Sequence, residues 1–323
     1  MRIAREAREA RLSRFAWGLL GYETLVVAWG AYVRASGSGA GCGRHWPMCN
    51  GEVIPRAPRV ATLVELSHRL SSGGALIGTL VLLVWSLRVY PRGHRVRRGA
   101  WTTASLMVVE ALIGAALVLF ELVAHDASMK RALSISLHLV NTFLLLASTA
   151  LTAWWASGGR PVSLRGQRTV ATLFGALLSA MIVVGASGAV TALGDTLFPA
   201  PSLAAGIAQD FAAGAHLFIR LRAVHPMLAT TTAAAIIVIM GLVRSLRPSP
   251  QVQVASRIAA GLAVTQVGAG LLDVLLRAPT WMQLVHLVIA DFVWVSLILT
   301  AAAALAEAPV PARAIEEEAL VAR

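Results

Sequence analysis

The sequence predicts an all-α integral membrane protein with eight transmembrane helices, arranged as two tandem, parallel-related four-helix bundles. First, 57% of its 323 residues are hydrophobic and 14% are charged, with a mean hydropathy of +0.71, whereas soluble domains average about 25% charged residues. Second, apolar stretches of about 20 residues, the length that crosses roughly 30 Å of hydrocarbon, recur along the chain. Third, the first four stretches and the last four carry similar motifs in the same order.

Polar or Pro/Gly-rich breaks separate the eight stretches, and each stretch is long enough to span a bilayer as a helix. They cover residues 15–35, 64–88, 100–122, 132–155, 169–191, 221–243, 255–276 and 281–305. The first stretch lacks a small-residue cleavage site and continues as a full span, so we expect no cleavable signal peptide. The segment 192–220, which contains Pro199 and Pro201, is expected to be a longer loop.

The net charge of +12 is spread over short basic clusters between the apolar stretches, whereas nucleic-acid-binding proteins gather such charge in one stripe. We therefore expect a lipid bilayer, and no nucleic acid, as the partner of these charges. The clusters precede the first stretch, separate the second from the third, follow the fourth and surround residues 244–257. The positive-inside rule then places both termini in the cytoplasm and predicts a multi-pass protein of the cell (plasma) membrane.

Four pairs of motifs relate the two halves of the chain. The first and fifth stretches end in small residues, at 30–37 and 185–191, and the third and seventh carry similar segments at 110–115 and 266–270. The second and sixth stretches share a histidine near their start, as do the fourth and eighth. Because each half has an even number of spans, both halves enter the membrane in the same direction. We place the domain boundary in the basic loop at 160–168, which gives domains 1–160 and 161–323.

Four histidines lie inside the even-numbered stretches, where ligating side chains are costly and are functional-site candidates by default. They are His68, His138, His225 and His286. Each lies roughly four to six residues past the outer end of its stretch, a depth of about 6–9 Å. Two facing imidazoles at one depth can coordinate opposite sides of a haem iron, so we predict His68 paired with His138 and His225 paired with His286. The alternative is that each histidine hydrogen-bonds a neighbouring helix.

Glu65 is the main difference between the halves. It precedes His68 by three residues, so on a helix it lies on the same face, one turn nearer the outside. The residue at the same spacing before His225 is Arg222. A carboxylate beside one site and absent from its copy indicates proton chemistry at the first site and electron transfer at the second. The alternative is an interfacial acid or a salt bridge from Glu65 to Arg69.

Glu110, where the seventh stretch has Gln266, is a second candidate, and a helix–helix hydrogen bond is the alternative for it. Basic side chains near the outer surface could pair with haem propionates or extend to lipid phosphate. These are Arg34, Arg69, Arg220 and Arg222.

Both cysteines, Cys42 and Cys49, fall in the first outward loop, within the segment 41–51. An outward bacterial loop is oxidising, so a disulfide between them is the leading interpretation. Reduced thiols, or a metal site shared with His45, are the alternatives. Two Cys and one His are too few for a closed zinc site without a further ligand.

Taken together, these features resemble the haem A synthase family over nearly the whole chain. The resemblance is carried by the Glu-x-x-His-Arg motif at Glu65, His68 and Arg69, by the three later span histidines, and by the cysteine pair in a Gly/Trp/Pro-rich outward loop. Members of that family oxidise the C8 methyl group of haem O to the formyl group of haem A, which terminal oxidases require. The chain departs from the expected pattern at Glu110, where we expect glutamine, and at Pro226, which follows the third histidine.

The resemblance implies that His68 and His138 face the substrate haem O and the product haem A. His225 and His286 would ligate a haem b that relays electrons, and Glu65 would be the catalytic acid or base. It also implies a Cys42–Cys49 disulfide. Haem O synthase and terminal oxidase assembly factors are the partners that it suggests.

Two other functions stay open. A di-haem b-type electron carrier would use both sites for electron transfer alone, and the effect of a Glu65 substitution on haem-methyl oxidation would discriminate between this carrier and the enzyme. A transporter with parallel repeats would line a polar path with the same histidines, and it would show no haem absorption.

Overall fold

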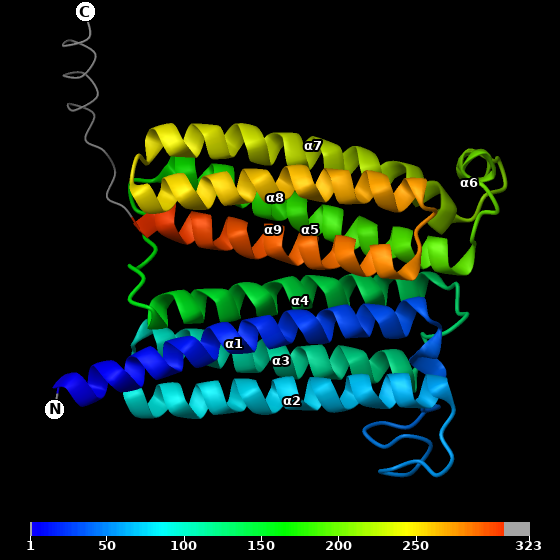
Figure 1. The fold of residues 1–323 in the computed structure, drawn as a ribbon, viewed down its shortest axis with the longest axis horizontal. Coiled ribbons are helices and arrows are strands. Elements are labelled where there is room, and N and C mark those ends of the chain that lie inside the picture. The colour runs from blue at the N-terminus through cyan, green and yellow to red at the C-terminus, as the bar shows by residue number, and fades with distance from the viewer. Residues whose placement is uncertain (1, 307–323) are drawn as a thin grey trace, which may run out of the picture.

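The computed structural model describes residues 2–306, and every long element in this part of the chain is an α-helix (Figure 1). The helices are α1 (Arg2–Ala35), α2 (Val60–Val89), α3 (Arg95–Leu119), α4 (Met129–Ala156), α5 (Arg168–Leu197), α6 (Leu203–Asp210), α7 (Leu217–Leu246), α8 (Pro250–Leu275) and α9 (Thr280–Ala306), with a short 3₁₀ helix, η1 (Ser38–Ala40). The predicted boundary at 160/161 falls between α4 and α5. The end of the second predicted domain, residues 307–323, lies outside the described residues.

Seven helices, α2 to α5 and α7 to α9, are long and apolar enough to cross a membrane, which confirms a helical multi-pass chain. The remaining predicted span, residues 15–35 within α1, is not among them. Glu23 interrupts its apolar stretch, and tryptophan, tyrosine and glycine residues dilute it, so its mean hydropathy is lower. Most helices extend a few residues beyond the predicted spans, because the backbone hydrogen-bond ladder continues into polar sequence.

Side-chain caps explain where several helices begin. The hydroxyl groups of Ser128, Ser202 and Ser249 accept hydrogen bonds from backbone N–H groups in the first turns of α4, α6 and α8. Such caps satisfy N–H groups that have no partner within the helix. The segment 192–220, expected to be one loop, is partly helical. Helix α5 continues to Leu197, α6 forms within the segment, and α7 starts at Leu217.

The helices pack as two neighbouring groups, α1 to α4 and α5 with α7 to α9 (Figure 1). Helices α4 and α9 lie at the centre, where the rings of Phe143 and Trp294 stack with centroids 4.8 Å apart. The indole Nε1 of Trp294 also donates a 2.6 Å hydrogen bond to the carbonyl of Phe143. The largest cluster of buried apolar side chains surrounds this contact, so the two groups share one core.

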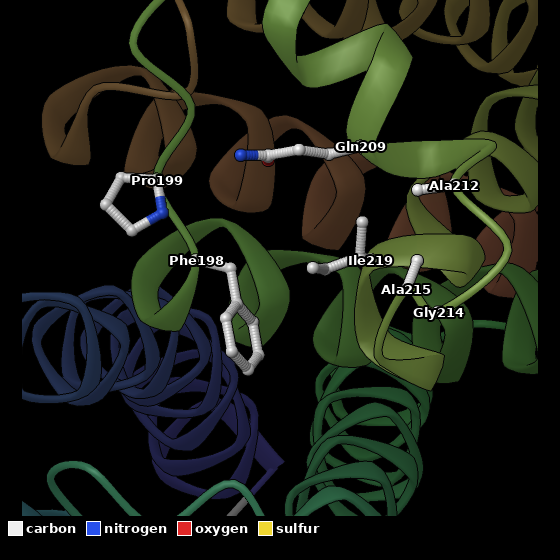
Figure 2. A pocket seen from close by; sticks show the side chains of 7 residues that line it. All are labelled: Phe198, Pro199, Gln209, Ala212, Gly214, Ala215 and Ile219. Atoms are coloured by element: carbon white, nitrogen blue, oxygen red, sulfur yellow. The ribbon is translucent and has the colours of Figure 1, made fainter.

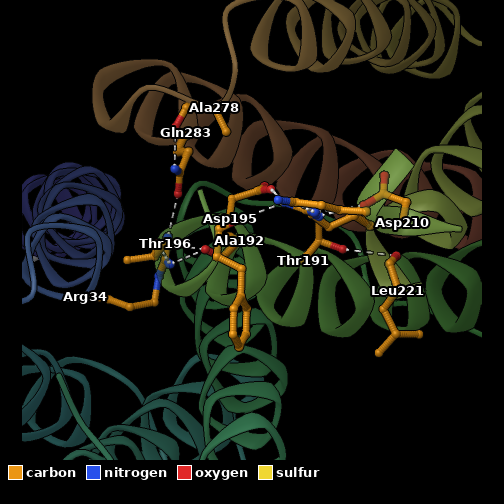
Figure 3. Close-up of polar contacts among 12 residues, drawn as sticks. Arg34, Thr191, Ala192, Asp195, Thr196, Asp210, Leu221, Ala278 and Gln283 are labelled. Atoms are coloured by element: carbon orange, nitrogen blue, oxygen red, sulfur yellow. Dashed lines mark hydrogen bonds and ion pairs between the residues drawn. The ribbon is translucent and has the colours of Figure 1, made fainter. Parts of the chain in front are cut away.

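A second contact joins the two groups at the end of the molecule that carries the cysteine loop. Arg34, at the end of α1, donates hydrogen bonds to the carbonyl of Ala192 at 2.8 Å and to Oγ1 of Thr196 at 3.1 Å, both on α5. Its other terminal nitrogen donates to Oε1 of Gln283 on α9 at 2.9 Å (Figure 3). One arginine of the first group thus holds two helices of the second.

Candidate functional site

The four predicted histidines lie at similar positions on α2, α4, α7 and α9, between six and nine residues past the first residue of each helix. At 1.5 Å per residue this is about 9–14 Å along the helix, deeper than predicted because the helices begin earlier than the apolar stretches. All four side chains are partly buried. His68 and His138 lie in the first group of helices, and His225 and His286 lie in the second.

In the first group of helices, each histidine packs against a glycine of the preceding long helix. A Cβ atom added to Gly30 of α1 would lie 2.8 Å from Cε1 of His68, and one added to Gly114 of α3 would lie 3.7 Å from Nε2 of His138. The first distance is shorter than real contacts allow, so His68 needs a glycine there. The imidazole consequently lies directly on the backbone of α1.

The second group repeats this arrangement. A Cβ atom on Gly188 of α5 would lie 2.9 Å from Cε1 of His225, and one on Gly270 of α8 would lie 3.0 Å from Cε1 of His286. The glycines of the repeated motifs and the histidines of the next helices are therefore parts of one structural unit that occurs four times.

The ring nitrogens differ in their partners. Nδ1 of His225 lies 2.9 Å from Oγ of Ser187, and Nδ1 of His138 lies 2.9 Å from Oε1 of Glu110. Nε2 of His286 lies 3.2 Å from Nε2 of Gln266. The buried Nδ1 atoms of His68, His138 and His286 make no hydrogen bond among the described residues, so the 2.9 Å approach of Glu110 to His138 is an ion-pair contact.

This donor set fits haem. An imidazole that ligates iron through one nitrogen usually gives its other nitrogen to a carboxylate, hydroxyl or carbonyl. Nδ1 of His225 has the hydroxyl of Ser187 2.9 Å away, and Nδ1 of His138 has the carboxylate of Glu110 at the same distance as an ion-pair contact. Nδ1 of His68 and Nδ1 of His286 make no hydrogen bond among the described residues, so both atoms are available to a ligand. The residues described here contain no cluster of three or more His, Cys, Asp or Glu side chains placed to hold a bare metal ion, but haem iron needs at most two protein ligands.

The loop between α1 and α2 carries the predicted disulfide, Cys42–Cys49, which excludes reduced thiols and a thiolate metal site with His45. Gly41 lies directly on the backbone of Ala61, and its carbonyl accepts a 2.8 Å hydrogen bond from Oγ1 of Thr62. The loop is therefore fixed to the first turn of α2.

Glu65, which is 3% exposed, binds this loop. Its Oε2 accepts a 2.8 Å hydrogen bond from the backbone N–H of Cys42, and its Oε1 accepts from both Nε and Nη2 of Arg69, the first at 3.1 Å. Arg69 in turn donates to the carbonyl oxygens of His45 and Met48, both at 2.6 Å. The salt bridge considered from the sequence is thus present, and Glu65 is a fixed carboxylate one turn outside His68.

The other outer arginines also bind protein groups. Arg222 donates to Oδ1 of Asp210 at 2.9 Å and lies 3.4 Å from Oδ1 of Asp195; both aspartates are labelled in Figure 3. Arg220 donates to the carbonyl of Ala213 at 2.5 Å. A shallow recess of about 330 Å³ lies beside them, lined by Phe198, Pro199, Gln209, Ala212, Gly214, Ala215 and Ile219 (Figure 2). None of the four histidines lines it.

Sequence reasoning missed two buried carboxylates. Glu23 of α1 is 2% exposed and Asp291 of α9 is 1% exposed, and no oxygen of either has a hydrogen-bond partner among the described residues. Each stands within an apolar stretch, and that position is the signal that could have found them, because such residues are functional candidates by default.

Comparisons with known proteins agree with the resemblance drawn from the motifs. Residues 13–298 match the COX15-CtaA family model, described as cytochrome oxidase assembly protein. Proteins named protoheme IX farnesyltransferase from two strains of Thermus thermophilus are 49% and 48% identical over 299 residues, covering 92% of this chain and 49% of each relative. A heme A synthase from Bacillus cereus is 41% identical over 96 residues, covering 30% of this chain and 31% of that protein. The chain therefore spans about half the length of the Thermus relatives.

Proposed function

The chain belongs to the COX15-CtaA family of cytochrome oxidase assembly proteins, and from that premise we propose that it is a haem A synthase, an oxidoreductase that converts the C8 methyl group of haem O to a formyl group. One observation carries the proposal. The histidine–glycine units are similar, yet among the described residues a carboxylate contacts a histidine of the N-terminal pair alone: Glu110 lies against His138, and Glu65 precedes His68 by one turn of α2.

In this proposal the N-terminal helices, within residues 1–160, hold the substrate. His68 and His138 face haem O and haem A, and the packing of His68 on Gly30 fixes where its ring can lie. Glu65 is the catalytic acid or base. Its contacts with Arg69 and the Cys42 N–H hold the carboxylate in one orientation, so that proton exchange occurs at a fixed point on the outer side of His68.

The C-terminal helices, within residues 161–323, bind haem b, which supplies electron transfer when present. His225 and His286 would hold it through their imidazoles, and Ser187 orients His225 by contacting Nδ1. The neutral partners Ser187 and Gln266 suit a site that transfers electrons alone.

We extend the proposal to topology. Helix α1 packs beside α2, α4 and α9 and ends at the same side of the molecule as the cysteine loop (Figure 1), which supports its role as an eighth span despite Glu23. The basic loops then face the cytoplasm with both termini, and the cysteine loop faces outward from the plasma membrane. The Thermus relatives named protoheme IX farnesyltransferase support haem O synthase as a partner, because that enzyme would supply the substrate.

The test is haem extraction and an optical spectrum of protein purified from cells that make haem O. We expect haem b together with haem O or haem A, and Glu65→Gln should abolish conversion to haem A while leaving haem b bound. Glu121→Gln is the matched control, since this carboxylate lies in an outer loop with 62% of its side chain exposed. Conversion that persists in Glu65→Gln would refute the catalytic role. Haem b without any conversion would indicate a di-haem carrier, and a protein without Soret absorption would indicate a transporter.

A further inference from the structure

Glu110 lies directly against one of the four histidines. Its Oε1 is 2.9 Å from Nδ1 of His138, and its side chain is 16% exposed. The same carboxylate accepts a 2.6 Å hydrogen bond from Nδ2 of Asn141 on Oε2 and a hydrogen bond from Oγ1 of Thr142 on Oε1. Both oxygens are thus held by α4, within the turn that follows His138.

The corresponding pair in the second group is built differently. Gln266 replaces the carboxylate with a neutral amide, and this amide contacts Nε2 of His286, whereas Glu110 contacts Nδ1 of His138. Nδ1 of His286 and Oε1 of Gln266 have no hydrogen-bond partner among the described residues. Of the two histidines, only His138 has an anionic partner.

The ring orientation of His138 follows from this contact. With Nδ1 facing Glu110, Nε2 is the nitrogen left for a ligand, and it lies on the side of Gly114, where a Cβ atom would be 3.7 Å away. A carboxylate on the distal nitrogen fixes the tautomer and ring orientation of a metal-ligating histidine and makes it a stronger electron donor.

We propose that Glu110 is a positioning residue for His138, which fixes Nε2 toward the haem in the N-terminal site and makes this ligand more electron-rich than His286. The inference rests on the proposed function, since it takes His138 to be a haem ligand. The inference also gives a reason for the two sites to differ. The carboxylate of Glu110 would stabilise the ferric form of a haem at the N-terminal site, whereas the neutral amide of Gln266 would not do so at the C-terminal site.

The experiment uses full-length protein purified from haem-deficient cells and titrated with haemin (iron protoporphyrin IX) in detergent. We expect Glu110→Gln to bind haem about 10–100-fold more weakly at the N-terminal site, with a raised midpoint potential and an altered low-spin EPR signal for that haem. The C-terminal haem should not change. The reciprocal Gln266→Glu substitution should lower the potential of the C-terminal haem, and it provides a second test if Glu110→Gln fails to fold.

Thr103→Val is the structural control, because Oγ1 of Thr103 bonds Oγ of Ser148 at 2.9 Å and so also joins α3 to α4, away from His138. It should lower the unfolding temperature without changing haem affinity or potential. If Glu110→Gln behaves like Thr103→Val, Glu110 only connects two helices and the inference is wrong. If wild-type protein takes up no haem at the N-terminal site, the proposed function fails, and the inference fails with it.

Discussion

Replacing Arg34 by methionine should separate the two groups of helices at the end that carries the cysteine loop. Methionine keeps much of the apolar packing but removes three hydrogen bonds from a charged group, to Ala192, Thr196 and Gln283. Hydrogen bonds of this kind contribute about 1.5–3 kcal/mol each. They are not additive and Arg34 is only partly buried, so we expect a loss of about 2–4 kcal/mol in the free energy of unfolding.

A loss of this size should lower the unfolding temperature of the detergent-solubilised protein by roughly 3–6 °C, because the entropy of unfolding grows with chain length. Intrinsic tryptophan fluorescence during heating measures it. The control is Arg44→Met, because Arg44 pairs with Glu121 at 3.4 Å while both side chains are more than half exposed; such pairs contribute less than about 1 kcal/mol.

A double-mutant cycle then isolates one contact. If Arg34 bonds Gln283, Arg34→Met combined with Gln283→Leu should cost about 1 kcal/mol less than the sum of the single substitutions. Full additivity, or a shift in Arg34→Met no larger than in Arg44→Met, would refute the role of Arg34 as the connection between the groups.

Three further substitutions test other parts of the structure. Gly188→Ala should weaken haem binding through His225 at least about tenfold, because the new Cβ atom would lie 2.9 Å from the ring. The control is Gly175→Ala on the same helix, whose Cβ atom meets nothing within 4 Å, so that this variant should bind haem normally. The amount of bound haem per protein measures both effects. Cys42→Ser should cost about 2–3 kcal/mol of stability through the loss of a short closed loop, seen as a lower unfolding temperature that matches reduced wild type. Trp294→Phe should cost about 1 kcal/mol for its hydrogen bond to an α4 carbonyl, and an unchanged unfolding temperature would show that the bond is not formed.

The sequence predicts most of the helices, because apolar stretches of membrane length leave few other structures. It also predicts the similar positions of the four histidines, since position along a helix depends only on residue number. The disulfide was predicted from the outward position that we expect for its loop, and the structure contains it. The partners of Glu65 were only partly predictable: Arg69 is four residues away on the same helix, but the N–H of Cys42 reaches Glu65 through a loop whose path no periodicity defines.

The contacts between helices could not be predicted. Whether Glu110 faces His138 depends on the rotation of α3 against α4, and the contact of Arg34 with α5 and α9 depends on how the two groups pack. α6 is too short to show a clear apolar period, and a serine cap is a weak signal on its own. Glu23 and Asp291 are different, since their buried positions were indicated by the apolar residues around them.

The structure changes how the repeat bears on function. The small-residue motifs and the span histidines are separate signals in the sequence, but in the structure the ring of each histidine packs on a glycine of the preceding long helix. Because this framework is similar at all four places, with a looser contact at Gly114, we look to the groups around the imidazoles for a difference in reactivity between the two sites. Those groups differ in charge: Glu110 stands where the other half has Gln266, and Glu65 stands where it has Arg222. Exchanging Glu110 and Gln266 is therefore the most direct way to ask whether charge alone distinguishes the two sites.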